Sequence, residues 1–364
     1  MNKEVISSKQ AICILTLYQL SNLVIGISPK AEQDTWITFL LGLVIYTPIL
    51  LTEIRIVSLY PGKNLYDIGI EIFGNVIGRI IAVFYIVYAI HLSSIHTKIF
   101  MVFMNIVALP NTPQTVILIF LLLFSVWMVK SGTEALGRWC RFLLPVVVLG
   151  IIAIFVIGLK DMNFRALKPV GGSDFGKIMD GTFSAHSNQI AEAVLFLTIF
   201  SSIKTTDKPY KIYITGVAIG ALGMLMTTIQ NITLLGVPSF SMFYFPTYKA
   251  VSITSVGDFF TRFEVVIGLI YIITGLVKIF LTLYATSIGM ARLFTVNNYK
   301  TMAFPAGLLM ATLANFFFKN TVQLFEWAPI YRYVYLDVQV ILPLIILAGA
   351  EIKNLKRKLT KTTP

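Results

Sequence analysis

Ten apolar runs divide this 364-residue chain, and they constrain its fold more than any other feature. A bilayer core of about 30 Å requires roughly 20 helical residues, and most of the runs approach or exceed that length. They are longer than the alternating segments of a membrane β-barrel, so they predict α-helices. The runs cover residues 11–27, 36–57, 76–104, 115–129, 141–159, 183–203, 212–237, 263–288, 302–318 and 334–350. We therefore expect an all-α integral membrane protein with about ten transmembrane helices.

The charged residues lie mostly in the short connections between these runs. Only 13% of the chain is charged, about half the share of a soluble domain. Because the net charge of +12 is spread over loops, it predicts no nucleic-acid partner. The side that would hold both termini carries 18 lysines and arginines against 9 on the other, which predicts cytosolic termini. Residues 351–364 then form a basic cytosolic tail, which either contacts anionic lipid or is a solvated stop-transfer segment.

Two of the runs are interrupted, and they lie five spans apart. The first contains SNLVIGISPK at 21–30, with Asn22 and Gly26 where regular helix is expected, and the sixth opens with GTFSAHSNQIAE at 181–192. Paired interruptions are typical of 5+5 inverted-repeat transporters, which hold their ligand at the broken helices. We expect one transmembrane domain over 1–350, with repeats of about 8–159 and 181–350. Ordinary packing contacts between helices remain an alternative interpretation.

Polar side chains recur at helical spacing inside three of the spans. The face with His91, Ser94 and Lys98 in the third span should turn inward, which leaves His96 pointing elsewhere. Similar faces carry Tyr271, Lys278 and Thr282 in the eighth span, and Ser184, Asn188 and Glu192 in the sixth. The predicted ligand-binding residues are Asn22, Gly26, His91, Ser94, Ser187, Asn188, Glu192, Tyr271, Lys278 and Thr282.

Glu192 is the most informative of these residues, because a carboxylate at membrane depth is costly unless it is paired, protonated or hydrated. Lys278 is its most economical partner. The pair is either a fixed structural element or a contact that Glu192 exchanges for a ligand ammonium or a proton; otherwise the two never meet. Lys98 either faces the interior or snorkels to the outer interface, and His91 is either a packing residue or a proton relay.

Two long connections, 160–182 and 238–262, are expected on the outer side. The second is rich in aromatic residues, which suits an interfacial lid, although an ordinary loop is the alternative. No phosphate loop, HExxH, GxSxG or CxxC motif is present, and Cys13 and Cys140 have no metal or disulfide spacing. Three histidines supply neither a metal cluster nor a nucleophile with its base. We therefore expect no enzyme, no cofactor and no metal.

Six short stretches resemble the spore germination permease family. They are AEQDTWI at 31–37, YPGKNL at 60–65, ALPNTP at 108–113, Glu192 followed by LFL, SVGDFFTRFE at 255–264 and LVKIFLTLYA at 276–285. Their order extends the resemblance from about residue 6 to residue 350. This family is the B subunit of nutrient germinant receptors in endospore-forming bacteria.

The resemblance implies an amino acid–polyamine–organocation fold, similar to sodium-coupled amino acid transporters. It also implies residence in the spore inner membrane, in a complex with a membrane-anchored A subunit and a C-subunit lipoprotein. The implied role is to sense a small nutrient germinant, such as an amino acid, a nucleoside or a sugar, with Glu192 and Lys278 as functional positions.

Three functions remain open at this point. The chain is a nutrient-binding subunit whose ligand shifts a closed–open equilibrium, a proton-coupled amino acid permease in which Glu192 titrates, or an ion-channel component. All three need the same pocket between the same helices, so the sequence alone does not separate them.

Overall fold

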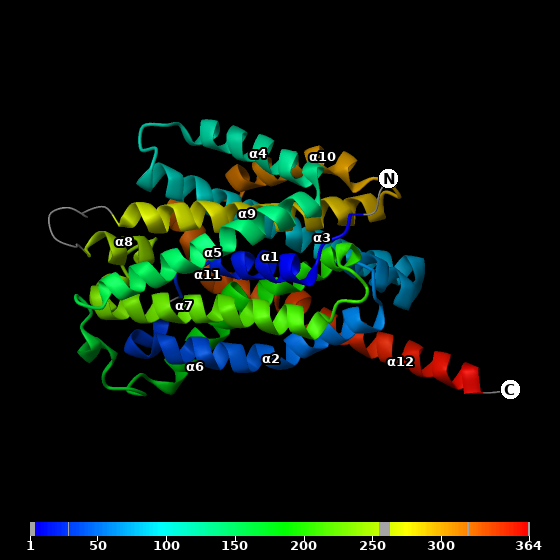
Figure 1. Ribbon diagram of the computed structural model, residues 1–364, viewed down its shortest axis with the longest axis horizontal. Helices are drawn as coiled ribbons and strands as arrows, with labels where there is room; N and C mark the ends of the chain where they lie inside the picture. The colour runs from blue at the N-terminus through cyan, green and yellow to red at the C-terminus, as the bar shows by residue number, and fades with distance from the viewer. Residues whose placement is uncertain (1–3, 28, 255–262, 319, 363–364) are drawn as a thin grey trace.

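The computed structural model describes residues 4–27, 29–254, 263–318 and 320–362, and this part of the chain is built from helices (Figure 1). The α-helices are α1 (Ser8–Leu20), α2 (Thr35–Leu59), α3 (Leu65–Val107), α4 (Gln114–Ser131), α5 (Thr133–Gly158), α6 (Phe175–Ala185), α7 (Pro209–Phe240), α8 (Pro246–Ser252), α9 (Glu264–Leu293), α10 (Tyr299–Phe316), α11 (Thr321–Val334) and α12 (Leu342–Thr362). Short 3-10 or π-helical pieces are η1 (Pro29–Asp34), η2 (Phe164–Leu167), η3 (His186–Ile190), η4 (Ala191–Ser202) and η5 (Asp337–Ile341).

The helices confirm the predicted all-α membrane architecture. In the described residues, seven helices are long and apolar enough to cross a bilayer; counting α10 and α11, which are bent by 103°, as one broken span gives eight. The remaining two predicted spans are the interrupted ones, which correspond to α1 and to the continuous segment α6–η3–η4. Each of the ten apolar runs therefore contains helical structure in the described chain.

Several boundaries differ from the sequence prediction, and one helix was not predicted. The sixth span was predicted to begin at residue 183, but α6 begins at Phe175 because an Asp174 side chain caps its first turn. The third span was predicted from residue 76, but α3 begins at Leu65 and turns at Gly74, whose φ is 79°. Helix α11 was not predicted, because Gln323 and Glu326 interrupt its apolar run.

Helix packing repeats between the two halves of the chain. Helix α1 packs against α7, and the equivalent pair α6 and α2 also pack together. The contact of α3 with α10 is matched in the same way by that of α9 with α4, while α3 and α9 pack on each other at the centre. This exchange of partners is what a 5+5 inverted repeat produces.

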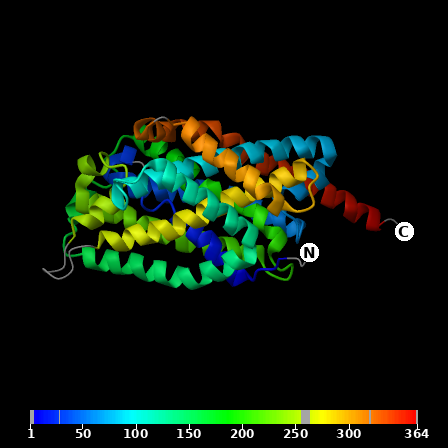
Figure 2. The same cartoon turned by 90° about the horizontal axis from the view of Figure 1, so that it is seen from above.

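Both ends of the described chain lie at the same end of the bundle, and the last part of α12 projects beyond it (Figures 1 and 2). At this end Ile6 forms a parallel bridge to Ile203. The Glu4 carboxylate makes three contacts there, to the starts of α5 and α10: it accepts from the Thr133 N–H at 2.9 Å, from the Tyr299 hydroxyl at 2.9 Å and from Lys300 at 2.8 Å. We call this arrangement the N-terminal clamp.

Candidate functional site

The site forms where α1 and α6 stop being regular helices. Helix α1 ends at Leu20, and the chain then unwinds to Gly26, which adopts a φ of 72°. Helix α6 ends at Ala185 and passes into the π-helical η3 and then the 3-10 helix η4. Both changes of helix type leave backbone carbonyls without their usual partners, and such groups must be satisfied inside a membrane protein.

Side-chain amides from each break satisfy the backbone of the other. The Asn22 amide donates to the carbonyls of Asn188 and Gln189 at 3.3 and 3.4 Å. In return, the Gln189 amide donates to the Gly26 carbonyl at 2.9 Å. Gln19, one turn before Asn22, donates to the Ile190 carbonyl at 3.3 Å. The two interrupted helices are thus held together by reciprocal polar contacts.

Glu192 and Lys278 form an ion pair in the centre of the bundle, with side chains that are 5% and 1% exposed. The Lys278 ammonium also donates to the Asn22 side-chain oxygen at 2.7 Å and lies 5.1 Å from the centre of the Tyr18 ring. The alternative in which Glu192 and Lys278 never meet is therefore wrong. A buried pair of this kind requires such additional contacts to offset its desolvation.

Three further residues surround Glu192. Tyr331 of α11 donates to a carboxylate oxygen at 3.3 Å, and Tyr18 of α1 donates to the Glu192 carbonyl at 3.1 Å. His96 of α3 places Nε2 at 3.5 Å from the carboxylate. The prediction that His96 points away was wrong, because α3 turns Leu92, His96 and their neighbours toward the site rather than the His91 face.

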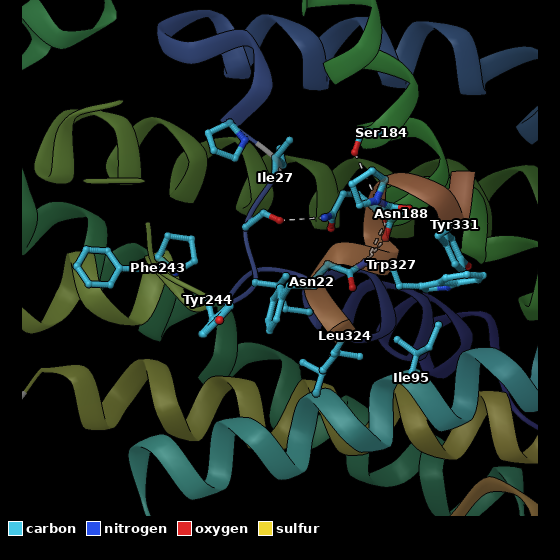
Figure 3. A pocket seen from close by; sticks show the side chains of 18 of the residues that line it. Asn22, Ile27, Ile95, Ser184, Asn188, Phe243, Tyr244, Leu324, Trp327 and Tyr331 are labelled. Atoms are coloured by element: carbon cyan, nitrogen blue, oxygen red, sulfur yellow. Dashed lines mark hydrogen bonds between the residues drawn. The ribbon is translucent and has the colours of Figure 1, made fainter. Parts of the chain in front are cut away.

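A cavity of about 340 Å³ lies over this group, between the two breaks (Figure 3). Four of the predicted ligand-binding residues line it: Asn22, Gly26, Asn188 and Glu192. Aromatic side chains from the end of α7, from the segment after it and from α11 line much of the rest: Phe240, Phe243, Tyr244, Trp327 and Tyr331. Because Phe243 and Tyr244 are also exposed, the cavity approaches the surface at the end of the bundle that holds α8.

Two more predicted residues lie directly behind the lining. Lys278 bonds to two lining residues, Asn22 and Glu192. Ser187 donates to the Gln339 side chain at 2.7 Å, and the Gln339 amide returns a bond to the Ser187 carbonyl at 3.1 Å. These contacts fix the π-helical break against η5.

The other four predicted residues lie outside the cavity lining. His91 packs against the rings of Phe317, Trp327 and Tyr335, and Tyr271 packs against Phe100 and Phe103. Ser94 and Thr282 donate to carbonyls of their own helices, those of Ile90 and Lys278. These four residues therefore do not line this cavity, because a polar residue in a span can be satisfied by its own helix or by neighbouring rings.

The two long connections both border the cavity end of the bundle. In the second, residues 240–244 and 246 line the cavity, which agrees with the predicted lid; residues 255–262, with most of the SVGDFFTRFE stretch, lie outside the described chain. In the first, the backbone amides of Gly171 and Ser173 donate to Asp34, and Lys30 pairs with Asp180 at 2.5 Å. The chain just after the first break is therefore fastened to the start of α6.

Sequence reasoning missed Gln189, Gln339, Tyr18, Trp327 and Tyr331. Gln189 and Gln339 carried a readable signal, because an amide within an apolar span needs partners inside the protein. The two tyrosines and the tryptophan carried none, since aromatic residues are common in membrane helices whether or not they line a site.

Comparison with known proteins identifies the family. A family model described as spore germination protein matches residues 5–322. The chain belongs to this family. Spore germination protein KB from Bacillus subtilis (strain 168) is 27% identical, over 99% of this chain and 98% of that protein. Spore germination protein A2 from the same organism is 23% identical over 76% of each chain.

The fold of this chain is similar to that of transporters of known structure. MhsT in complex with L-phenylalanine superposes with a TM-score of 0.71 at 14% identity, covering 96% of this chain and 89% of that one. Mhp1, a nucleobase-cation-symport-1 family transporter in a closed conformation, superposes with a TM-score of 0.65 at 11% identity, covering 92% and 79%. This spore germination protein therefore has a transporter-like membrane fold.

Proposed function

We propose that this chain is the nutrient-sensing, transporter-like subunit of a spore germinant receptor. The observation that carries the proposal is the cavity between the two broken helices, with the Glu192–Lys278 pair and Asn22 beside it. A small germinant that enters this cavity would bind the closed and open states with different affinities and so shift their equilibrium. The resulting movement of α1 and α6 would be the signal.

An amino acid is the germinant class that best suits the cavity. Its volume of about 340 Å³ is at the lower end of small-molecule pockets. The lining combines a carboxylate, which attracts an ammonium group, with the Asn22 and Asn188 side chains and a set of aromatic rings. Lys278, now committed to Glu192 and Asn22, offers a cation to a ligand carboxylate if the pair separates.

The family and the charge distribution support a proposal for the membrane location, the orientation and the partners of the protein. We infer residence in the spore inner membrane with both termini in the cytosol, since the positive-inside bias favours that orientation. The proposed partners are the A subunit and the C-subunit lipoprotein of the receptor, together with membrane lipid. The N-terminal clamp and the projecting part of α12 then lie on the cytosolic side.

The test begins with binding. Full-length protein in lipid nanodiscs is titrated with the L-amino acids one at a time, and the unfolding temperature is followed. We expect one or a few amino acids to raise this temperature in the wild type but not in Glu192→Gln. Glu326→Gln, on the exposed surface of α11, is the matched control. Equal stabilisation of the wild type and Glu192→Gln would reject the proposed site.

Flux measurements then separate the three functional readings. In sealed liposomes, binding without uptake supports a sensing subunit. Saturable, pH-driven uptake of the labelled amino acid would overturn it in favour of a proton-coupled permease. Ion flux triggered by the amino acid would assign the chain to the conducting part of the receptor.

A further inference from the structure

Glu53 is a second buried carboxylate, and the proposed function does not use it. It lies on α2, does not line the cavity, and is fully buried. One carboxyl oxygen accepts a hydrogen bond from the hydroxyl of Tyr46 at 3.0 Å. Tyr46 lies two turns earlier on the same helix. The other oxygen is buried and has no hydrogen-bond partner in the described structure.

The groups around Glu53 are hydroxyls from four helices. Besides Tyr46, three tyrosine hydroxyls interact electrostatically with the Glu53 carboxylate. They belong to Tyr213 of α7, Tyr85 of α3 and Tyr18 of α1. The hydroxyls of Tyr85 and Tyr213 are buried and have no hydrogen-bond partner of their own. The Tyr46 hydroxyl, at 3.0 Å, can therefore accept a hydrogen bond from a protonated Glu53 carboxyl group.

Charged groups on several elements that pack against α2 pair with other residues. On η4, Glu192 is paired with Lys278; on α6 and η1, Lys177 and Asp180 pair with Glu32 and Lys30; on α12, Glu351 and Arg357 pair with Arg55 and Glu71. His186 of η3 packs against the Tyr46 ring. Within the described residues, no cationic side chain lies at ion-pair distance from Glu53.

An ionised carboxylate in this place would be both desolvated and unpaired, which is far more costly than keeping its proton. A neutral carboxylic acid has one O–H donor, and that donor can bond to a tyrosine hydroxyl. We propose that Glu53 is a proton-binding site, protonated in this conformation and hydrogen-bonded to Tyr46 of the same helix. When water reaches this half of the bundle, the carboxyl O–H bond breaks, the proton passes to water, and the carboxylate stays hydrated.

Infrared spectroscopy of the full-length protein in lipid at neutral pH tests the site directly. We expect the carbonyl stretch of a protonated carboxylic acid in the wild type, its loss in Glu53→Gln and its retention in Glu192→Gln. Tyr46→Phe should shift the band without removing it, because one hydrogen bond is lost. An identical band in Glu53→Gln, or no such band in the wild type, would overturn the proposal.

The pH dependence of folding stability gives a second test of the Glu53 site. Because the folded state holds a proton that the unfolded state releases, the wild type should lose stability relative to Glu53→Gln as pH rises from about 5 to about 8. Glu53→Gln keeps the shape and hydrogen bonding of the neutral acid, so it should fold. Parallel melting curves across this range would contradict the assignment. Neither measurement uses a germinant, so both stand apart from the test of the nutrient site.

Discussion

The Gln189 amide donates to the Gly26 carbonyl at 2.9 Å, so the second broken helix completes the hydrogen bonding of the first. The contact depends on Gly26 holding a positive φ of 72°, a conformation that favours glycine. A Cβ atom at Gly26 would also lie 3.1 Å from the Pro246 ring of the segment that covers the cavity. Gly26 therefore holds a left-handed backbone conformation, contacts the second broken helix and lies against the segment that covers the cavity.

Gly26→Ala should lower the free energy of unfolding by about 1–3 kcal/mol, through strain at positive φ, and should weaken amino acid binding. Thermal unfolding and ligand titration in nanodiscs measure the two effects. The matched control is Gly268→Ala in α9, where an added Cβ meets nothing within 4 Å. Equal behaviour of the two variants would show that the bend at Gly26 is dispensable.

Lys278→Met should destabilise the protein by about 3–5 kcal/mol, because it leaves the Glu192 charge buried without its partner. The double variant Glu192→Gln/Lys278→Met should recover most of that loss, since neither charge remains. Unfolding free energies of the singles and the double give the coupling.

The exposed pair of Lys177 and Glu32 provides the control for this cycle. Its removal should change stability by about 1 kcal/mol or less. If Lys278→Met is no worse than Lys177→Met, the central pair is not what stabilises the breaks.

Gln339→Leu should cost about 1–3 kcal/mol, because it leaves the buried Ser187 hydroxyl without its acceptor. Ser187→Ala removes the other end of the same bond. The two losses should be non-additive, with the double variant close to the worse single. Simple additivity would indicate that the Ser187–Gln339 bond contributes little.

The N-terminal clamp should loosen in acid. Burial raises the pKa of Glu4, but hydrogen bonds from Lys300, Thr133 and Tyr299 outweigh it and hold the pKa below its ordinary value. A lowered folded-state pKa gives stabilisation that is present above the unfolded value of about 4.5 and is lost as pH falls through the folded value. Protease cleavage near the N-terminus should therefore increase at low pH.

Glu4→Gln should show this increased cleavage already at neutral pH, and its cleavage should vary less with pH than that of the wild type. Glu326→Gln serves as the control, because Glu326 is exposed on α11. A wild-type cleavage rate that stays constant down to acid pH would contradict the role of Glu4.

The fold was largely readable from the sequence because a bilayer demands long apolar helices, and ten runs met that demand. The apolar runs did not indicate how each helix is rotated about its own axis, and therefore which of its faces points to the site. His96 and His91 are five residues apart on α3, and the prediction chose the wrong one to face Glu192. Helical spacing defines which residues share a face, but only packing decides where that face points.

The centre of the site was found because charges within a membrane are rare. Glu192, Lys278 and Asn22 stood out for that reason, and the structure brings the three together. Tyr331 was hidden, because α11 is too polar to be recognised as a span and joins the site only through a 103° bend after α10. Bends of this kind depend on contacts distant in sequence.

The reciprocal amides of Asn22 and Gln189 have a consequence for how this chain can change over generations. A substitution that straightens one break removes the hydrogen-bond partners of the other, so neither helix can regain regular form alone. Tolerated changes at these positions should arrive in compensating pairs. A new germinant preference would then be acquired by altering the aromatic cover of the cavity, while the joined breaks are inherited as one unit.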